Sequence, residues 1–160
     1  MPTIINGFAY PALTDTQTSA SVNVGTLVNL DDGGQAVYVQ AASEISQYNA
    51  VCIPATNVAT NATTARVANT KRVGFAQVSI ASGSYGWVQL GGKVRVNVSA
   101  SCLPGVALYT TTTEGRLDDA TVSGAMVAGV VTELTASATS AMTAVAAYTM
   151  VIPVPSNVTP

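Results

Sequence analysis

The sequence contains no histidine, and charged residues of both signs make up only 9% of its 160 positions. Without histidine the chain lacks the commonest general base of enzymes, the Ser-His and Cys-His nucleophile systems and the main nitrogen ligand of transition metals. A typical soluble domain carries about 25% charged residues, so a free monomer of this composition is poorly protected against association. These absences argue against an enzyme and favour a structural or binding protein that hides surface in an assembly.

Basic clusters and long apolar runs are missing as well. The net charge is −2 and the isoelectric point about 4.7, so nucleic acid is not an expected partner. The most apolar run, AMTAVAAYTMVIPV, is interrupted by Thr and Tyr and has no flanking Lys or Arg. The N-terminal stretch MPTIINGFAYPALTD has no basic residues before its apolar ones. We therefore expect neither a membrane span nor a secretory signal.

Only two cysteines are present, Cys52 and Cys102. In a chain without a secretory signal we expect two buried, reduced thiols, with a disulfide as the alternative. Two cysteines without histidine cannot build an ordinary zinc site unless carboxylates contribute. The stretch EGRLDD, with Glu114, Asp118 and Asp119, could hold calcium, but it lacks the spacing of a known calcium loop and is read as a solvated turn. We expect no metal and no cofactor.

The chain is rich in Ala, Val and Thr, and the last two favour strands. From Gly25 onward, short strand-like runs alternate with turn signals such as DDGG, ASGS, GG and TEGR. This spacing predicts an all-β domain, a small antiparallel β-barrel or sandwich, over residues 25–155, with a C-terminal tail at 156–160. Helix is expected for no more than a turn or two, near 43–48 or 135–147. Residues 55–70 are expected to be a long surface connection ending in a short strand.

Residues 1–24 form a separate N-terminal segment. Pro2 and Pro11 interrupt any helix, and the polar stretch TDTQTSASVNV indicates an extended arm. The arm carries bulky side chains that a disordered tail rarely has. Such an arm packs against its own domain or against a neighbour. We expect it to reach beyond its own domain and to dock on a neighbouring subunit or another partner through Ile4, Ile5, Phe8 and Tyr10.

The only tryptophan, Trp87, lies in the stretch YGWVQLGGKVRV. If the two central glycines form a two-residue turn, the flanking runs pair as a hairpin. Trp87 then points to the core with Val94, Val96 and Val98, and an exposed binding aromatic is the alternative. The opposite face is either a solvated sheet surface or a contact surface for an acidic, partly apolar partner. Its residues are Val88, Leu90, Lys93 and Arg95.

Three stretches resemble the strands and turns of a family of small β-rich tailed-phage head proteins, the capsid decoration or cement proteins. They are ASGSYGWVQLGGKVRV, SCLPGVALYTTTTEGRLDDATVSGAMVAGVV and QAVYVQAASEISQYNAVCI. The resemblance covers about residues 35–152 and includes no catalytic signature. It implies an all-β virion protein, assembled in the host cytoplasm, that binds the outer surface of an icosahedral capsid and bridges major capsid proteins. Such proteins are often symmetric oligomers, and here we expect a homo-oligomer, a trimer rather than a dimer.

A second function remains open, that of a head-fibre or tail module that recognises host-surface glycans. A glycan-binding module is expected to expose aromatic side chains on loops. Tyr109 and Tyr148 instead lie in strand-like runs, and Trp87 is expected in the core. The capsid decoration function is therefore preferred.

Overall fold

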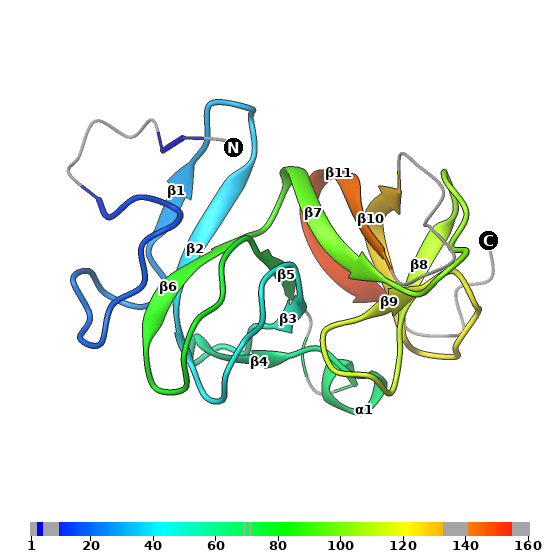
Figure 1. The fold of residues 1–160 in the computed structure, drawn as a ribbon, viewed down its shortest axis with the longest axis horizontal. Coiled ribbons are helices and arrows are strands. Elements are labelled where there is room, and N and C mark those ends of the chain that lie inside the picture. The colour runs from blue at the N-terminus through cyan, green and yellow to red at the C-terminus, as the bar shows by residue number, and fades with distance from the viewer. Residues whose placement is uncertain (1–2, 5–9, 69, 71, 133–140, 155–160) are drawn as a thin grey trace.

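A computed structural model describes residues 3–4, 10–68, 70, 72–132 and 141–154, the last of these ranges by its backbone only. The fold is nearly all-β, as predicted, and consists of a five-strand barrel beside a curled half-barrel sheet (Figure 1). No helix in these ranges is long and apolar enough to span a membrane. The strands of the barrel unit are β1 (Leu27–Asn29), β2 (Gln35–Ala41), β3 (Ala50–Cys52), β4 (Val58–Asn61), β5 (Val73–Ala76) and β6 (Tyr85–Gln89). Helix α1 (Thr64–Val67) precedes β5, and the half-barrel contains β7 (Gly92–Val98), β8 (Ala107–Thr110), β9 (Leu117–Asp118), β10 (Met126–Thr132) and β11 (Ala141–Val154).

The first half of the chain closes into the barrel. β2 pairs with β4 and β6, β4 pairs with β3, and β5 pairs with both β3 and β6, which completes a ring. The β2–β4 pairing is parallel and the other four are antiparallel. β1 forms a hairpin with β2 through the DDGG turn, with Val28 opposite Ala36, which confirms the sequence-based prediction for this turn.

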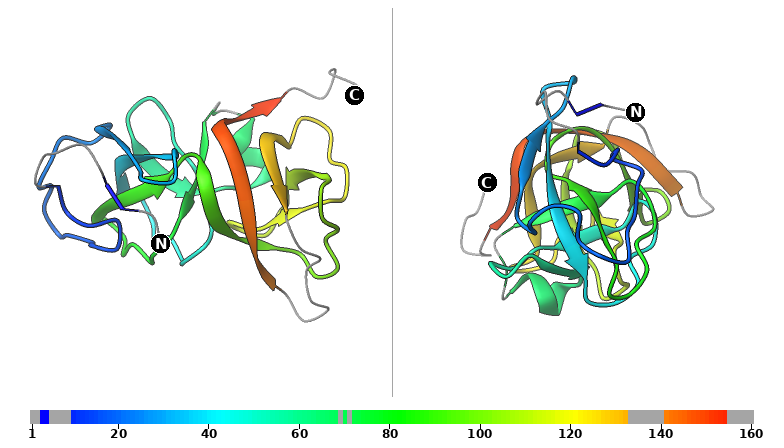
Figure 2. Two further views of the ribbon diagram at one scale, coloured as in Figure 1. Left: turned by 90° about the horizontal axis from the view of Figure 1, so that it is seen from above. Right: turned by 90° about the vertical axis from the view of Figure 1, so that its left-hand side faces the viewer.

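The second half forms the curled sheet. The long strand β11 pairs with β7 on one side and β10 on the other, and β8 connects β10 to β9. The two-residue β9 meets β7 at Leu117 and Val98. β11 also reaches β5, where Val151 lies opposite Val73, so that one strand joins the two units. Figure 2 shows β11, coloured orange to red, running along the side of the half-barrel.

Three clusters of buried side chains form the core. The barrel cluster fills the ring and consists of Val37, Val39, Ala41, Ile45, Val51, Ile53, Ala59, Ala76, Ile80, Val88 and Leu90. The junction cluster lies between the units and consists of Ala50, Cys52, Ala62, Val67, Val73, Phe75, Val94, Val96, Val98, Cys102, Leu108, Leu117, Val127 and Val130. The arm cluster lies outside the ring and consists of Leu13, Val28, Leu30, Ala36, Tyr38 and Trp87.

The alternation of side chains along each strand assigns residues to these clusters. In β2, Val37 and Val39 belong to the barrel cluster, whereas Ala36 and Tyr38 belong to the arm cluster. β3 divides its side chains in the same way between the barrel and junction clusters. Because successive side chains point to opposite faces, a strand buried on both faces has no polar face. This is why these runs are almost continuously apolar in the sequence.

The described part of the arm docks on its own chain. Gln17 and Tyr85 exchange two backbone hydrogen bonds, of 2.7 and 2.9 Å. The indole Nε1 of Trp87 donates to the Pro11 carbonyl at 3.1 Å, and the Tyr38 hydroxyl donates to the Gln17 side chain at 2.6 Å. Of the two expected placements of the arm, residues 10–24 show packing against their own domain, because the outer face of the barrel offers an apolar surface that these residues cover.

The expected hairpin at Gly91-Gly92 is also wrong. β6 pairs with β2 and β5, and β7 pairs with β11 and β9, so the chain crosses here from the barrel to the half-barrel. The Asp32 carboxylate, in the β1–β2 turn, accepts a hydrogen bond from the backbone of Lys93 at 3.0 Å and holds this crossover. Trp87 is buried as predicted, at 1% exposure. It lies in the arm cluster, however, while the three valines of β7 lie in the junction cluster.

The segment 55–70 is not the expected surface connection. It contains β4 and α1, and Ala59, Ala62 and Val67 are buried. The Thr63 hydroxyl caps α1 by accepting from the Arg66 backbone at 3.3 Å. No helix forms at 43–48, where Ile45 makes an isolated bridge. Residues 141–147 belong to β11, and 135–140 lie outside the described residues, as does the expected tail.

Candidate functional site

The structure does not bring the predicted contact residues of β6 and β7 onto one surface. Val88 and Leu90 are 0% and 1% exposed, inside the barrel cluster. Lys93 and Arg95 are exposed on β7, and the Arg95 guanidinium lies 5.8 Å from the centre of the Tyr48 ring. The predicted four-residue face therefore does not exist, because it depended on the β6–β7 hairpin.

The predicted arm contacts lie against the barrel where they are described. Ile4 makes an isolated bridge with Leu30, and Tyr10 packs edge-on against Trp87 with ring centres 5.9 Å apart. Ile5 and Phe8 lie outside the described residues. In the single chain, then, the arm is an apolar cover for the barrel.

The acidic turn at EGRLDD makes ordinary structural bonds. Glu114 forms an ion pair of 2.7 Å with Arg66, and Asp119 accepts from the Leu103 backbone at 3.0 Å. Within the described ranges, no three His, Cys, Asp or Glu side chains come together in a way that could hold a metal ion. These carboxylates stabilise turns and join α1 to the β8–β9 connection.

Both cysteines are free and buried, which confirms the prediction of two unbonded thiols. Burial raises the pKa of the Cys52 thiol to about 11, against smaller opposing effects of the Thr63 backbone and Arg66. Burial also raises the pKa of Cys102 to about 11, and Asp119 and Asp118 add to that shift. The thiolate is the reactive form, so neither cysteine is suited to nucleophilic chemistry.

We expect neither thiol of the folded protein to react with a thiol reagent at about pH 8, and both to react once it is denatured. An unfolded thiol ionises near pH 8.5 and the folded thiols near 11. The folded state therefore retains protons that the unfolded state loses, and stability falls as pH rises between these values. Replacing both cysteines by alanine should reduce that fall. Rapid labelling of the native protein would contradict the burial of the thiols.

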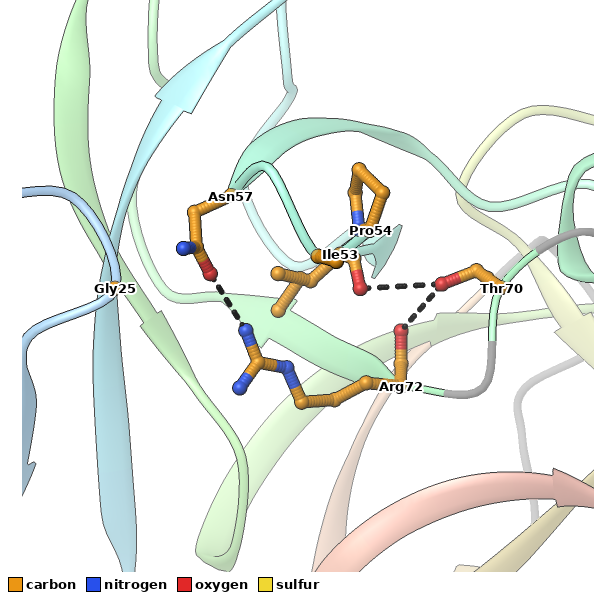
Figure 3. A pocket seen from close by; sticks show the side chains of 7 residues that line it. Gly25, Ile53, Pro54, Asn57, Thr70 and Arg72 are labelled. Atoms are coloured by element: carbon orange, nitrogen blue, oxygen red, sulfur yellow. Dashed lines mark hydrogen bonds between the residues drawn. The ribbon is translucent and has the colours of Figure 1, made fainter.

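A concave site lies on the barrel beside Arg72 (Figure 3). It has a volume of about 570 Å³ and is lined by Gly25, Ile53, Pro54, Ala55, Asn57, Thr70 and Arg72. Three separate parts of the chain build it: the start of the β1 hairpin, the β3–β4 turn and the approach to β5. The Thr70 hydroxyl, which donates to the Ile53 carbonyl at 3.1 Å, fixes the approach to β5 against the end of β3.

The backbone of the β3–β4 turn and the close approach of Gly25 fix the position of the Asn57 side chain in this site. Asn57 ends the β3–β4 turn with a positive φ of 57°, and its backbone donates to Pro54 at 2.9 Å. Its side-chain oxygen accepts from Arg72 Nη2 at 2.7 Å. Gly25 lies so close that an added Cβ would be 2.6 Å from Asn57 Nδ2. The site therefore presents one arginine, positioned by an asparagine, in an open hollow with largely apolar walls.

Sequence reasoning did not single out Arg72. Its only local signal is a pair of basic residues before a strand, which is typical of many strand entrances. The residues that complete the site lie 15 and 47 positions away in sequence, at Asn57 and Gly25 (72 − 57 and 72 − 25). Only the closure of the barrel brings them together.

The aromatic side chains of the described residues are buried or half-buried. Trp87, Tyr38 and Phe75 are buried, and Tyr10, Tyr48, Tyr85 and Tyr109 are half-buried. The exposed large apolar side chains are instead aliphatic: Val24, Leu27, Val58 and Leu103. None of these described aromatic residues is fully exposed, whereas sugar rings are commonly stacked on exposed aromatic faces.

The fold and the site define an all-β protein of two joined units with an arginine-lined pocket. In the described part of the chain it has no metal-binding cluster and contains no reactive thiol. No family model matches the chain, and no curated protein matches it significantly in sequence.

Proposed function

We propose that the protein is a structural component of a tailed-phage virion that binds the outer surface of the capsid and stabilises the lattice of the major capsid protein. The observation that carries the proposal is the way the parts of the chain are locked together. Arm, barrel and half-barrel are joined by buried apolar clusters and by continuous strand pairing. A body of this kind can transmit load between the subunits that it bridges.

The composition of the chain supports the same function. A low content of charged residues suits a protein that hides surface in an assembly, and the free thiols suit assembly in a reducing host cytoplasm. The exposed side chains include Lys93 and Arg95 on β7 and Leu103, which is 54% exposed. The major capsid protein is the proposed partner, and the protein is proposed to act without enzymatic activity.

A symmetric homo-oligomer, preferably a trimer, fits the local threefold positions of an icosahedral shell. Each added contact with the shell is then effectively intramolecular, so avidity can exceed single-site affinity by a factor on the order of 10² or more. The affinity of each individual contact with the shell can therefore be low. This agrees with the scattered exposed aliphatic side chains described above.

The alternative is a head-fibre or tail module that binds host glycans. The arginine-lined pocket would give such a module a polar anchor. The burial or half-burial of the described aromatic side chains weighs against glycan binding, because sugar rings are commonly held by stacking on exposed aromatic faces.

We expect phage particles lacking the protein to break at lower temperature or on chelation while retaining the normal amount of DNA. Adding back the purified protein should restore their stability. The measurement is DNA release against temperature, with adsorption to host cells followed in parallel. Particles that are equally robust but fail to adsorb would favour the glycan-binding alternative.

A further inference from the structure

We propose that the pocket around Arg72 binds a carboxylate that an extended segment of a partner protein presents next to an apolar side chain. The inference rests on the proposed function only in naming the major capsid protein as that partner. The pocket residues that make the contact are Gly25, Asn57 and Arg72, and the apolar lining beside them is Ile53, Pro54 and Ala55.

No carboxylate in the described part of the chain neutralises the charge of Arg72. A guanidinium has five N–H donors in a planar fork, and the Arg72 group uses one of them, toward Asn57. Seven of the eight Asp and Glu residues lie in the described part of the chain, the exception being Glu133, and none of the seven pairs with Arg72. Four donors therefore remain among the described contacts, and two neighbouring ones suffice for a carboxylate, which matches such a fork in a bidentate pair.

The guanidinium of Arg72 is partly withdrawn from water. Arg72 is half-buried in a pocket that Ile53, Pro54 and Ala55 also line, and burial lowers the pKa of its guanidinium. A charge withdrawn from water without an opposite charge is costly, and a bound carboxylate offsets that cost. The same low-dielectric wall strengthens the attraction between the two charges. Arg66, by contrast, has an opposite charge beside it in Glu114, and the two side chains are 40% and 53% exposed to solvent.

The apolar lining of the pocket, at Ile53, Pro54 and Ala55, favours a peptide over a small anion. Two exposed valines, Val24 and Val58, lie next to the pocket residues Gly25 and Asn57 in the sequence, at 37% and 36% exposure. In an extended chain, side chains on one face repeat at roughly 6.6 Å, or two residues. A peptide that presents its carboxylate to Arg72 can thus bring an apolar side chain two positions away to the same side of the pocket.

The direct test uses nuclear magnetic resonance on the whole chain. The probe is the peptide acetyl-Val-Asp-Val-amide, titrated while the backbone signals of Gly25 and Asn57 and the Arg72 side-chain Nε–H signal are followed. We expect saturable shifts at these three positions. Arg72→Gln should weaken binding by about tenfold or more, as the loss of one charge-assisted pair implies, and Arg72→Lys should retain part of it. Arg116→Gln removes the same charge from the β8–β9 turn and should bind as the wild type does.

Three further probes separate the possible sources of the carboxylate. The peptide with Asn in place of Asp should give no saturable shift. A peptide acetyl-Val-Ala-Val with a free C-terminus tests a terminal carboxylate, and tighter binding than the Asp peptide would identify the chain end as the source. Acetate tests a bare anion. If acetate binds as well as the Asp peptide, or if Arg72→Gln leaves the shifts unchanged, the proposal is overturned.

A capsid-binding assay separates this proposal from the proposed function. Wild-type protein and Arg72→Gln, matched in unfolding temperature, are added to shells that lack the protein. Binding of the wild type together with weaker binding of the variant supports both proposals. Equal binding by the two proteins excludes the pocket as the capsid contact while the proposed function stands. Failure of the wild type to bind overturns the proposed function, and the peptide titration then decides on the pocket alone.

Discussion

Replacing Trp87 by alanine is expected to destabilise the protein by about 3–5 kcal/mol, which is the usual cost of removing a buried aromatic side chain from a core. Trp87 is 1% exposed and is the largest member of the arm cluster. Its ring packs against Tyr38 at 5.0 Å between ring centres, and against Tyr10 at 5.9 Å. The substitution therefore removes the surface on which the arm lies.

The same change should release the arm before it unfolds the barrel. Residues 10–24 are held by the cluster, by the bond from Trp87 to Pro11 and by the pairing of Gln17 with Tyr85. We expect a protease to cut within this range in the variant at concentrations that leave the wild type intact. Chemical denaturation gives the free energy of unfolding alongside.

The conservative variant Trp87→Phe separates packing from hydrogen bonding. It keeps an aromatic ring but loses the N–H group, so Pro11 loses its side-chain donor. We expect a loss nearer 1–2 kcal/mol and an arm that stays largely protected. An arm as protected in Trp87→Ala as in the wild type would show that the cluster does not hold it.

Replacing Gly115 by alanine is expected to cost roughly 2–4 kcal/mol, because it combines backbone strain with disruption of a buried polar network. Gly115 has a φ of +70°, and an added Cβ would come within 2.2 Å of Asn49 Cγ. Its backbone donates to Ala62 and accepts from Ala50, both at 2.8 Å, so the β8–β9 turn is fastened between β3 and β4. The residue cannot move away without breaking these bonds.

The side chain that would have to move is the centre of an amide network. Asn49 donates to the Asn61 side chain at 2.9 Å and accepts from Asn97 at 2.7 Å. The three asparagines come from the barrel and the half-barrel, and together they join the two units. Displacing Asn49 leaves buried donors and acceptors without partners, and each such group costs roughly 1–3 kcal/mol.

A matched control isolates the steric part of this effect. Gly105 has the same φ of +70°, but nothing lies within 4 Å of a Cβ added there. Gly105→Ala should cost only the conformational strain. The double variant Gly115→Ala with Asn49→Gly should lose less than the sum of the two single variants, because the glycine removes every Asn49 side-chain atom near the added Cβ, the Asn49 Cβ at 2.4 Å included. Equal losses in Gly105→Ala and Gly115→Ala, measured by thermal unfolding, would contradict the contact.

Local signals in the sequence predicted local pairing well. The DDGG turn joins neighbouring strands, so turn chemistry alone identified the β1–β2 hairpin. Gly91-Gly92 gave a similar signal, yet β6 pairs with β2, where Trp87 lies opposite Tyr38, forty-nine positions earlier (87 − 38). Closing a ring and burying both faces of β6 outweighed one local turn. A short-range pattern contains no information about that competition.

The helix and the candidate site were missed for related reasons. Helix α1 has four residues, too few to show a helical period, and is stabilised by its cap and by buried Val67. The pocket depends on Gly25, Asn57 and Arg72, which no spacing rule connects. The burial of Trp87 was predictable from its strand, whereas the arm as its cover was not, because docking depends on the shape of the finished barrel.

The strand that joins the two units also sets an order of events on the ribosome. All five barrel strands lie within residues 35–89, so the ring can close while the rest of the chain is still being made. β11 comes last and supplies partners for β5, β7 and β10. Until residues 141–154 emerge from the exit tunnel, β5, β7 and β10 lack the strand that pairs with them. During that time the nascent chain exposes apolar residues of the junction cluster to chaperones and to other chains being translated from the same messenger RNA. Slow translation of that last strand would therefore lengthen the aggregation-prone interval.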